Sequence, residues 1–320
     1  MKRIVCAAYG APDVVRLVES PDEAPRPGEV VVRVGAAGVN YVDALMIAGT
    51  YQIKVPPPFT PGSEIAGTVV AVGSNVTGVS AGDRVVAFCG LGGYASHVRL
   101  SAQSVVACPA EVDTATAAAV VQSYSTAVFA LRDRAQLRAD DVVAVAGAAG
   151  GVGLACIDVA RAAGARVGAV ASSAAKRDAA LAAGADEAFD ANDPELKARL
   201  RAFGATVVVD PVGGALSEVA LRALAWGGRL VVIGFPAGVA RLPTNLTLLN
   251  NRAIVGVDWG AWALRNPDSQ RDLLRDLLEQ IAHGRLRGPT VAPWPLADAA
   301  RALNALLDRV AIGKQALIPD

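Results

Sequence analysis

Apolar residues in the second half of the chain fall into short runs, separated by longer segments with helical periodicity. The runs lie at 142–146, 166–171, 187–189, 206–209, 229–233 and 254–257. Short runs that do not alternate with polar residues are typical of parallel strands covered by helices on both faces. Six such strands alternating with helices predict an α/β fold with a doubly wound, six-stranded parallel sheet.

The chain up to about residue 115 has a different pattern, in which short runs are separated by turn residues. Strands are predicted at 29–34, 65–72, 83–88 and 94–100, with a helix at 41–48. This pattern is typical of a small β-barrel domain. A helix capped by Asp113 or Thr114 is predicted to run to about Arg134, with a break near Ser123. Helices at 272–283 and 296–307 and a strand at 314–318 form a tail that we expect to return to the first domain.

A cluster of glycines follows the first strand of the α/β region. Gly147, Gly150 and Gly153 lie between that strand and a helix predicted to begin near Val152. A tight strand-to-helix turn needs a residue without a Cβ, and a pyrophosphate can approach the backbone only where side chains are missing. The positive end of the helix would face that anion. The pattern is A-x-G-x-x-G rather than G-x-G-x-x-G, but the strand that follows Gly164 completes a βαβ unit and supports a dinucleotide site.

Composition and charge narrow the classes of partner. The chain has 320 residues, 53% hydrophobic and 5% aromatic, with zero formal net charge. No overall field would attract nucleic acid or an anionic membrane, so neither is expected as a partner. Four cysteines without C-x-x-C spacing argue against disulfides and a cysteine-bound zinc, and favour a reducing cytoplasm. The uncharged run at 142–157 is too short to span a bilayer.

The end of the second α/β strand bears on the choice of cofactor. Enzymes that prefer NAD usually carry an acid there, which binds the ribose 2′-hydroxyl. This chain has Ser172 and Ser173 instead, followed by Lys176 and Arg177. Hydroxyls and cations suit a 2′-phosphate, whereas a carboxylate would repel it. The sequence therefore predicts NADP(H), although Ser172 capping a helix beside solvated cations is the alternative.

Several longer stretches together resemble the zinc-independent quinone oxidoreductase (zeta-crystallin-like) branch of the medium-chain dehydrogenase/reductase superfamily. They are AAGVNYVDALMIAGTY (36–51), FTPGSEIAGTVVAVG (59–73), GDRVVAF (82–88), AGAAGGVG (146–153), DPVGG (210–214), GGRLVVIGF (227–235), NLTLLNNRAIVGVDWG (245–260) and GKQALIP (313–319). The resemblance implies a GroES-like β-barrel catalytic domain (1–119 and 265–320) interrupted by a Rossmann NADP-binding domain (120–264). It also implies NADPH as hydride donor and a homodimer joined through the last Rossmann strand.

Zinc-dependent relatives place metal ligands at three positions that are Asn40, Ser63 and Gln122 in this sequence. These side chains do not form a plausible Zn²⁺ ligand set, so no metal is expected. Without that Lewis acid, ionising an alcohol is disfavoured. The chemistry left is hydride transfer to a quinone or an α,β-unsaturated carbonyl compound.

The resemblance also assigns candidate site residues. Asn40 and Thr126 match positions beside the nicotinamide and its ribose, and Arg309 matches a family arginine near the 2′-phosphate. Ala191 stands where relatives often carry a tyrosine near the adenine, which weakens the expected preference for NADPH. The candidate cofactor-binding residues are Asn40, Thr126, Ala149, Gly150, Gly151, Val152, Ser172, Ser173, Lys176, Arg177, Pro211, Ile233, Gly234, Phe235, Val257, Trp259 and Arg309.

Tyr51 and Asn40 are the candidate catalytic residues. Tyr51 matches a tyrosine at the mouth of the family's substrate cleft, where it either donates a proton or is merely an edge aromatic. Asp43 is interpreted as an anchor of a helix terminus rather than a proton donor. Trp262, His97 and His283 are interpreted as packing or exposed residues.

Two further hypotheses remain open. An enoyl-thioester or acrylate-type reductase would share all these motifs and differ at the rim of its pocket. A non-enzymatic, crystallin-like protein would bind NADPH only as a stabilising ligand. The sequence does not name the acceptor, because the loops at 51–60 and 257–265 determine the shape of its pocket.

Overall fold

The computed structural model describes residues 1–319, and the chain divides into two compact units. The barrel unit comprises Met1–Gln122, Pro267–Gly284 and Pro289–Asp320, and the Rossmann unit comprises Ser123–Asn266 and Arg285–Gly288. None of the helices within residues 1–319 has the length and apolarity needed to cross a bilayer.

The Rossmann unit is built on a six-stranded parallel sheet. Its strands are β8 (Val142–Ala146), β9 (Arg166–Ala171), β10 (Glu187–Asp190), β11 (Val207–Asp210), β12 (Arg229–Val232) and β13 (Ala253–Gly256). They lie in the order β10-β9-β8-β11-β12-β13, and every pairing is parallel. The predicted doubly wound sheet is confirmed, and its winding reverses between β8 and β11.

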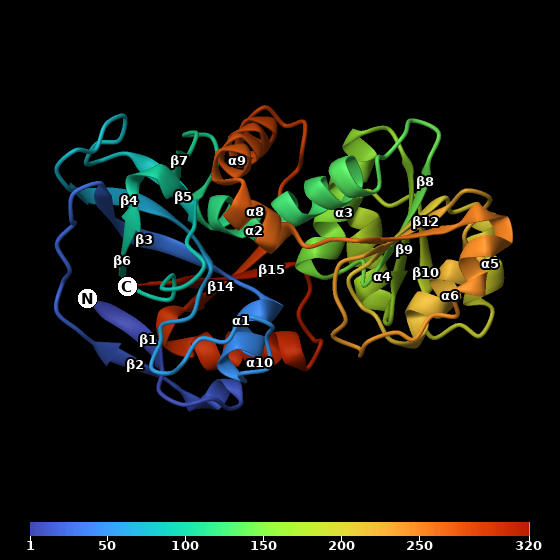
Figure 1. Ribbon diagram of the computed structural model, residues 1–320, viewed down its shortest axis with the longest axis horizontal. Coiled ribbons are helices and arrows are strands. Elements are labelled where there is room, and N and C mark those ends of the chain that lie inside the picture. Colours follow the sequence, from blue (N-terminus) through green and yellow to red (C-terminus); the bar gives the residue numbers. More distant parts are fainter. Residues whose placement is uncertain (320) are drawn as a thin grey trace. The chain divides into compact units, whose positions relative to one another are not determined.

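Helices cover both faces of this sheet (Figure 1). The covering helices are α3 (Gly151–Ala162), α4 (Ala174–Ala182), α5 (Leu196–Phe203) and α6 (Ala215–Ala223). The unit also contains α7 (Asn245–Leu248) and α8 (Trp259–Arg265). On one face α5 and α6 pack through Leu200, Phe203 and Leu221 against Val208 and Leu230 of the strands. Burial of this apolar surface holds helices and sheet together.

The segment 285–288 belongs to the Rossmann unit because a buried carboxylate binds it. Asp158 of α3 accepts hydrogen bonds from the N–H groups of Arg287 and Gly288, at 2.8 and 3.2 Å, and from the hydroxyl of Tyr124 at 3.0 Å. The side chain of Asp158 is nearly inaccessible, so these donors satisfy a carboxylate that would otherwise be costly to bury.

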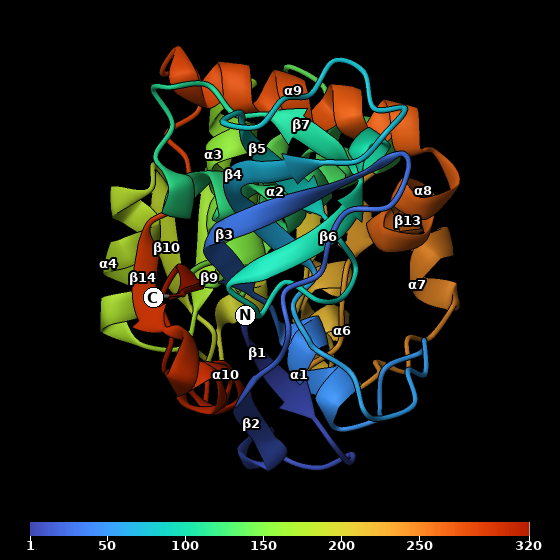
Figure 2. The same ribbon diagram turned by 90° about the vertical axis from the view of Figure 1, so that its left-hand side faces the viewer.

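The barrel unit combines a seven-stranded sheet with a small hairpin. Its strands are β1 (Lys2–Cys6), β2 (Val15–Glu19), β3 (Glu29–Val39), β4 (Glu64–Val72), β5 (Arg84–Phe88), β6 (His97–Ser101), β7 (Val105–Ala107), β14 (Val291–Pro295) and β15 (Lys314–Ile318). The long strand β3 pairs with β4 and, through its first residues, with β6 (Figure 2). Its last residues pair with β15. The last strand therefore returns to the first domain and lies beside the segment that carries Asn40.

Helices of the barrel unit are α1 (Tyr41–Ile47), α9 (Pro267–Ala282), α10 (Ala299–Leu307) and the first part of α2 (Thr114–Val128). Alternate residues of β3, among them Val30, Val32 and Val34, enter the core together with Ile65 of β4 and Leu303 of α10. Successive side chains of a strand point to opposite faces, so apolar residues at every second position of β3 make the face toward the core apolar.

Some local predictions were wrong. Helix α2 continues through Ser123 and gives way to a π-helical turn only at Phe129–Arg134, because its alanine-rich sequence sustains a helix and Ser123 is accommodated in the buried interior. Strand β6 begins at His97 rather than Tyr94. Strands β2, β7 and β14 were not predicted. Charged residues interrupt the apolar ones of β2, and β7 has only three residues. The Val-Ala-Pro-Trp-Pro of β14 carries prolines, which suit an edge strand.

Candidate active site

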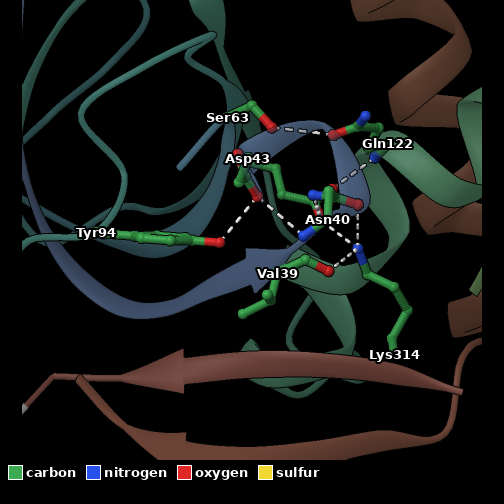
Figure 3. Close-up of polar contacts among 8 residues, drawn as sticks. Val39, Asn40, Asp43, Ser63, Tyr94, Gln122 and Lys314 are labelled. Carbon is green, nitrogen blue, oxygen red and sulfur yellow. Dashed lines mark hydrogen bonds and ion pairs between the residues drawn. The ribbon is translucent and has the colours of Figure 1, made fainter. Parts of the chain in front are cut away.

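A cluster of polar side chains lies inside the barrel unit (Figure 3). It includes Asn40, one of the predicted site residues. Its members, called the polar cluster below, come from β4, α1, the segment before β6, α2 and β15. They are Asn40, Asp43, Ser63, Glu64, Tyr94, Gln122 and Lys314.

Glu64 and Lys314 form the centre of the polar cluster. The Lys314 ammonium lies 2.6 Å from Oε1 of Glu64, and the two side chains are 3% and 0% exposed, with the lysine first. Oε2 of Glu64 accepts from the backbone N–H of Gln122 at 2.6 Å, and Lys314 also donates to the carbonyl of Val39 at 3.3 Å. Buried charges persist in proteins when they are paired and hydrogen-bonded in this way.

Asn40 is bound by both charged groups. Its Nδ2 donates to Oε1 of Glu64 at 2.8 Å, and its Oδ1 accepts from the Lys314 ammonium at 2.6 Å. Asn40 precedes α1, and its backbone N–H donates to Oδ2 of Asp43 at 2.9 Å. The amide is therefore fixed at the start of a helix, and 9% of the residue remains exposed.

Asp43 anchors the start of α1, as its sequence position suggested, but it is also part of the polar cluster. Its Oδ2 accepts from the hydroxyl of Tyr94 at 2.8 Å, whereas Oδ1 has no hydrogen-bond partner within residues 1–319. Complete burial raises the pKa of Asp43 from its ordinary 3.8 to about 7, although the bonds from Tyr94 and Asn40 act in the opposite direction.

Ser63 and Gln122, the two other positions that bind metal in zinc-dependent relatives, are bonded to one another. Ser63 Oγ donates to Oε1 of Gln122 at 2.9 Å. Within residues 1–319, no group of three or more His, Cys, Asp or Glu side chains is arranged to hold a metal ion. Asn40 and the backbone N–H of Gln122 donate to Glu64, and Ser63 donates to the side chain of Gln122. Hydrogen bonds therefore link all three positions to Glu64.

The backbone of β3 leaves room for this arrangement at Gly38. A Cβ added at Gly38 would lie 2.0 Å from Oε1 of Glu64, far inside van der Waals contact. Glycine is therefore required at this position for the carboxylate to reach Asn40 and Lys314.

The glycine turn of the Rossmann unit has the geometry of an anion cradle. Gly147 has φ +58°, a conformation that favours glycine, and a Cβ at Gly153 would lie 2.3 Å from the carbonyl oxygen of Gly147. Helix α3 begins at Gly151, directly after the predicted Ala149 and Gly150, and its first turn contains Val152. The N–H groups of such a first turn are free to bind a pyrophosphate, so these residues fit a dinucleotide.

The predicted 2′-phosphate site contains an acid that sequence reasoning did not consider. Ser173 caps α4, and Lys176 and Arg177 lie in its first turn. An Nη of Arg177 lies 3.0 Å from Oδ2 of Asp190, at the end of the neighbouring strand β10. Hydrogen bonds from Asn192, followed by the charge of Arg177, hold the pKa of Asp190 below its usual range.

The Asp210–Gly214 loop is anchored by its own carboxylate. Asp210 is fully buried and accepts from the N–H groups of Val212 and Gly213, both at 2.9 Å, and from Ser217 Oγ at 2.5 Å. Its carbonyl accepts from the N–H of Ile233 at 2.9 Å and of Gly234 at 3.4 Å. The predicted residues Pro211, Ile233 and Gly234 thus lie together at the carboxyl ends of β11 and β12.

The remaining candidates are spread over both units. Thr126 on α2 and Trp259 at the start of α8 are buried, Phe235 is exposed, and Val257 bonds to Val232 at the end of β13. Trp262 packs against Phe129, with ring centroids 4.9 Å apart. Arg309 follows α10 and belongs to the barrel unit, whereas Ser172 and Lys176 belong to the Rossmann unit. Tyr51, in the loop after α1, is half-buried.

A cavity of about 400 Å³ lies in the barrel unit. Arg3, Leu91 and His97 are among the residues that line it. None of the predicted site residues contributes to its wall, so we do not assign the acceptor to it.

The geometry can be compared with known proteins. Residues 26–110 match the family model "Alcohol dehydrogenase GroES-like domain", and residues 151–279 match "Zinc-binding dehydrogenase". The chain is 34% identical over 324 residues to a quinone oxidoreductase-like protein 2 homolog of Nematostella vectensis, covering 98% of this chain and 87% of the relative. The chain belongs to the zinc-independent quinone oxidoreductase branch of the medium-chain dehydrogenase/reductase superfamily.

Two further comparisons bear on function. The crystal structure of Escherichia coli quinone oxidoreductase complexed with NADPH matches with a TM-score of 0.89 and 30% identity, over 100% of both chains. A mycocerosic acid synthase-like polyketide synthase of Mycobacterium tuberculosis is 34% identical over 289 residues, which are 88% of this chain and 14% of that protein.

Four residues of these sites were given no role from the sequence: Glu64, Tyr94, Lys314 and Asp190. Glu64 and Lys314 lie inside stretches that resemble this oxidoreductase branch. The signal that would have singled them out is a lone charge within an apolar strand, in Glu-Ile-Ala-Gly-Thr-Val-Val and in Lys-Gln-Ala-Leu-Ile. Two lone buried charges of opposite sign predict a pair.

Asp43 should make stability depend on pH. Because its folded-state pKa lies above the unfolded value, the folded protein keeps a proton that the unfolded chain has lost. The resulting stabilisation is fully present below about pH 4 and is lost as the pH rises to about 7. The unfolding free energy of the wild type minus that of Asp43→Asn should fall by up to about 4 kcal/mol across this range, measured by urea unfolding.

Asn is the matched variant because it resembles the neutral form of Asp43 and can still accept from Tyr94. Asp83→Asn, which replaces an exposed carboxylate of the barrel unit, serves as the control for the substitution itself. A difference between wild type and Asp43→Asn that stays constant from pH 4 to pH 7 would show that Asp43 does not take up a proton on folding.

Proposed function

We propose that this chain is an NADPH-dependent oxidoreductase that transfers a hydride to quinones or α,β-unsaturated carbonyl compounds without zinc. The observation that carries the proposal is the polar cluster, in which a lysine–glutamate pair binds Asn40 at a position where zinc-dependent relatives bind metal. The relationship to quinone oxidoreductases supports the same chemistry.

The Rossmann unit supplies the residues proposed to bind NADPH, which carries the transferable hydride when bound. The first turn of α3 receives the pyrophosphate, while Ser172, Lys176 and Arg177 receive the 2′-phosphate. The E. coli relative crystallised with NADPH supports this assignment.

The barrel unit is proposed to bind the acceptor. A quinone needs no Lewis acid, because its reduced form is a stabilised phenolate that takes its proton from water. Asn40 and Tyr51 are proposed to donate hydrogen bonds to the oxygen on which negative charge develops. Holding the acceptor in position then supplies most of the rate.

A second candidate acceptor is an enoyl thioester. The similarity to a polyketide synthase favours it, since that match covers 88% of this chain. Both candidates accept a hydride into a conjugated carbonyl system, but only the enoyl thioester is joined to a carrier through sulfur.

We also propose that the protein is a cytoplasmic homodimer joined through β13. This strand lies at one edge of the Rossmann sheet. Ile254 on the strand is 41% exposed, and just before the strand Leu248 and Leu249 are 78% and 53% exposed. An exposed apolar edge strand invites pairing with a second copy of the same chain.

Asp190→Asn should shift cofactor preference toward NADPH. It leaves Arg177 without its carboxylate partner, so that a 2′-phosphate no longer competes with Asp190 for the guanidinium. We expect NADPH binding to tighten several-fold, whereas Lys176→Ala should weaken it by roughly 10- to 100-fold. Fluorescence titration with NADPH and NADH provides the measurement.

Glu187→Gln is the matched control, since Glu187 lies on the same strand and pairs with Arg166 instead. Affinity for NADH should not change in any of these variants. Equal affinities of the wild type for NADPH and NADH would contradict the assigned 2′-phosphate site.

Tyr51→Phe should separate the acceptor classes. We expect a loss in kcat/KM within about tenfold, or ~1.4 kcal/mol, for quinones and a larger loss for simple enones, whose enolates are more basic. The measurement is NADPH oxidation with ortho- and para-quinones, enones, enals and acyl thioesters, for wild type and variant. Failure of the wild type to oxidise NADPH with any acceptor would refute the proposed function, and a thousandfold loss with quinones would make Tyr51 an essential acid.

Ile254→Lys should convert the proposed dimer into a monomer, because it places a charge on the edge of β13. Sedimentation velocity on wild type and variant measures this. Leu264→Lys is the control, since Leu264 is 65% exposed on α8 rather than on β13. A wild type that sediments as a monomer would disprove the dimer.

A further inference from the structure

The orientation of the Asn40 amide is determined by its two neighbours. An ammonium can only donate hydrogen bonds, and an ionised carboxylate can only accept them. Lys314 therefore selects Oδ1 of Asn40, and Glu64 selects Nδ2. A flip of the amide would place a donor against the ammonium and an acceptor against the carboxylate, so both contacts favour a single orientation.

The same geometry identifies the hydrogen that remains available. The Lys314 ammonium lies 2.6 Å from both Oδ1 of Asn40 and Oε1 of Glu64, so the three groups close a ring. Within this ring, Nδ2 of Asn40 uses the hydrogen on the same side as Oδ1 to bind Glu64. The second Nδ2 hydrogen, on the opposite side, has no acceptor among the described residues.

The pair also makes that second hydrogen a better donor. A cation bound to Oδ1 withdraws electrons from the amide, and hydrogen bonds in a chain polarise one another in a medium of low dielectric constant. Of the three groups in the ring, Asn40 has the greatest exposure, at 9% against 3% and 0% for the side chains of Lys314 and Glu64. The polarised N–H thus belongs to the least buried residue of the ring.

We propose that Lys314 is a positioning residue which, together with Glu64, orients and polarises the Asn40 amide so that its second N–H binds the acceptor oxygen. This inference rests on the proposed function and adds a role for two residues that do not themselves touch the acceptor. The matching class of ligand is a hydrogen-bond acceptor, such as a quinone or enone oxygen, and not a hydroxyl donor.

A purely structural role for Lys314 makes a different prediction. If the lysine only stabilised the barrel, the effects of Lys314 and Asn40 substitutions on turnover would be independent. If Lys314 acts through Asn40, its loss should matter only while Asn40 is present. A double-mutant cycle distinguishes these cases.

Lys314→Met alone leaves Glu64 buried without its partner, which threatens folding. The experiment therefore uses Lys314→Met/Glu64→Gln, which removes both charges and keeps a side chain of the same shape beside Asn40. Asn40→Ala and the triple variant complete the cycle. Steady-state kcat and KM are measured with NADPH and a para-quinone, and the binding of NADPH is measured separately.

We expect the charge-free variant to lose roughly 10- to 100-fold in kcat/KM for the quinone, while the dissociation constant of NADPH stays within about twofold. Asn40→Ala should cause a similar loss, and the triple variant should be no worse than Asn40→Ala. Losses that multiply in the triple variant would overturn the inference and leave Lys314 a structural role only.

Nuclear magnetic resonance of the protein without cofactor gives a readout that does not need turnover. The two Nδ2 hydrogens of Asn40, assigned by their loss in Asn40→Asp, should resonate far apart, and the hydrogen bound to Glu64 should exchange slowly with solvent. In Lys314→Met/Glu64→Gln the separation should shrink. Unchanged Asn40 signals in that variant would also overturn the inference.

Gly38→Ala is an independent variant that retains both charges. Its Cβ would lie 2.0 Å from Oε1 of Glu64 and must displace the carboxylate. It should reproduce the loss in kcat/KM and the change in the Asn40 signals, and unchanged values for both would count against the role of Glu64. If the wild type turns over no acceptor, the proposed function fails, while the Asn40 signals still test the positioning by Lys314.

Discussion

The buried pair of Glu64 and Lys314 is the interaction on which the rest of the candidate site depends. It joins β4 to β15, through residues that are 250 positions apart in the chain, and it carries the hydrogen bonds to Asn40 and Gln122. Removing one partner of such a pair typically costs about 3–5 kcal/mol, because the other charge is left buried alone. The barrel must therefore close with its last strand in place before Asn40 can be oriented.

The two units build their sites in different ways. In the Rossmann unit the anion cradle is local, since Gly147, Gly153 and the first turn of α3 lie in one short stretch. In the barrel unit the polar cluster collects side chains from distant segments, and its Gly38 is needed only because Glu64 lies against it. A site within one short stretch is specified by the sequence of its own turn. A site built from distant segments forms only when the whole unit has folded.

This difference explains what the sequence could reveal. The bounds of β8, β9 and β15 were predicted correctly, because continuous apolar runs and glycine turns are local signals. The pairing of Arg177 with Asp190 was missed, because it joins the first turn of α4 to the end of β10, and these meet only after folding. The break expected near Ser123 is absent for the same reason, since the surrounding interior accommodates that serine within a continuous helix.

We propose that the ion pair of Glu64 and Lys314, rather than a metal, prepares this site for hydride transfer. The most direct test is a single-turnover measurement on protein that has been treated with a strong chelator and shown by elemental analysis to hold no stoichiometric zinc. NADPH with deuterium at its transferable position is mixed rapidly with a para-quinone and the protein. We predict that the cofactor absorbance disappears stoichiometrically, more slowly than with unlabelled NADPH, and that added Zn²⁺ changes nothing. Transfer that begins only after Zn²⁺ is added would contradict the account.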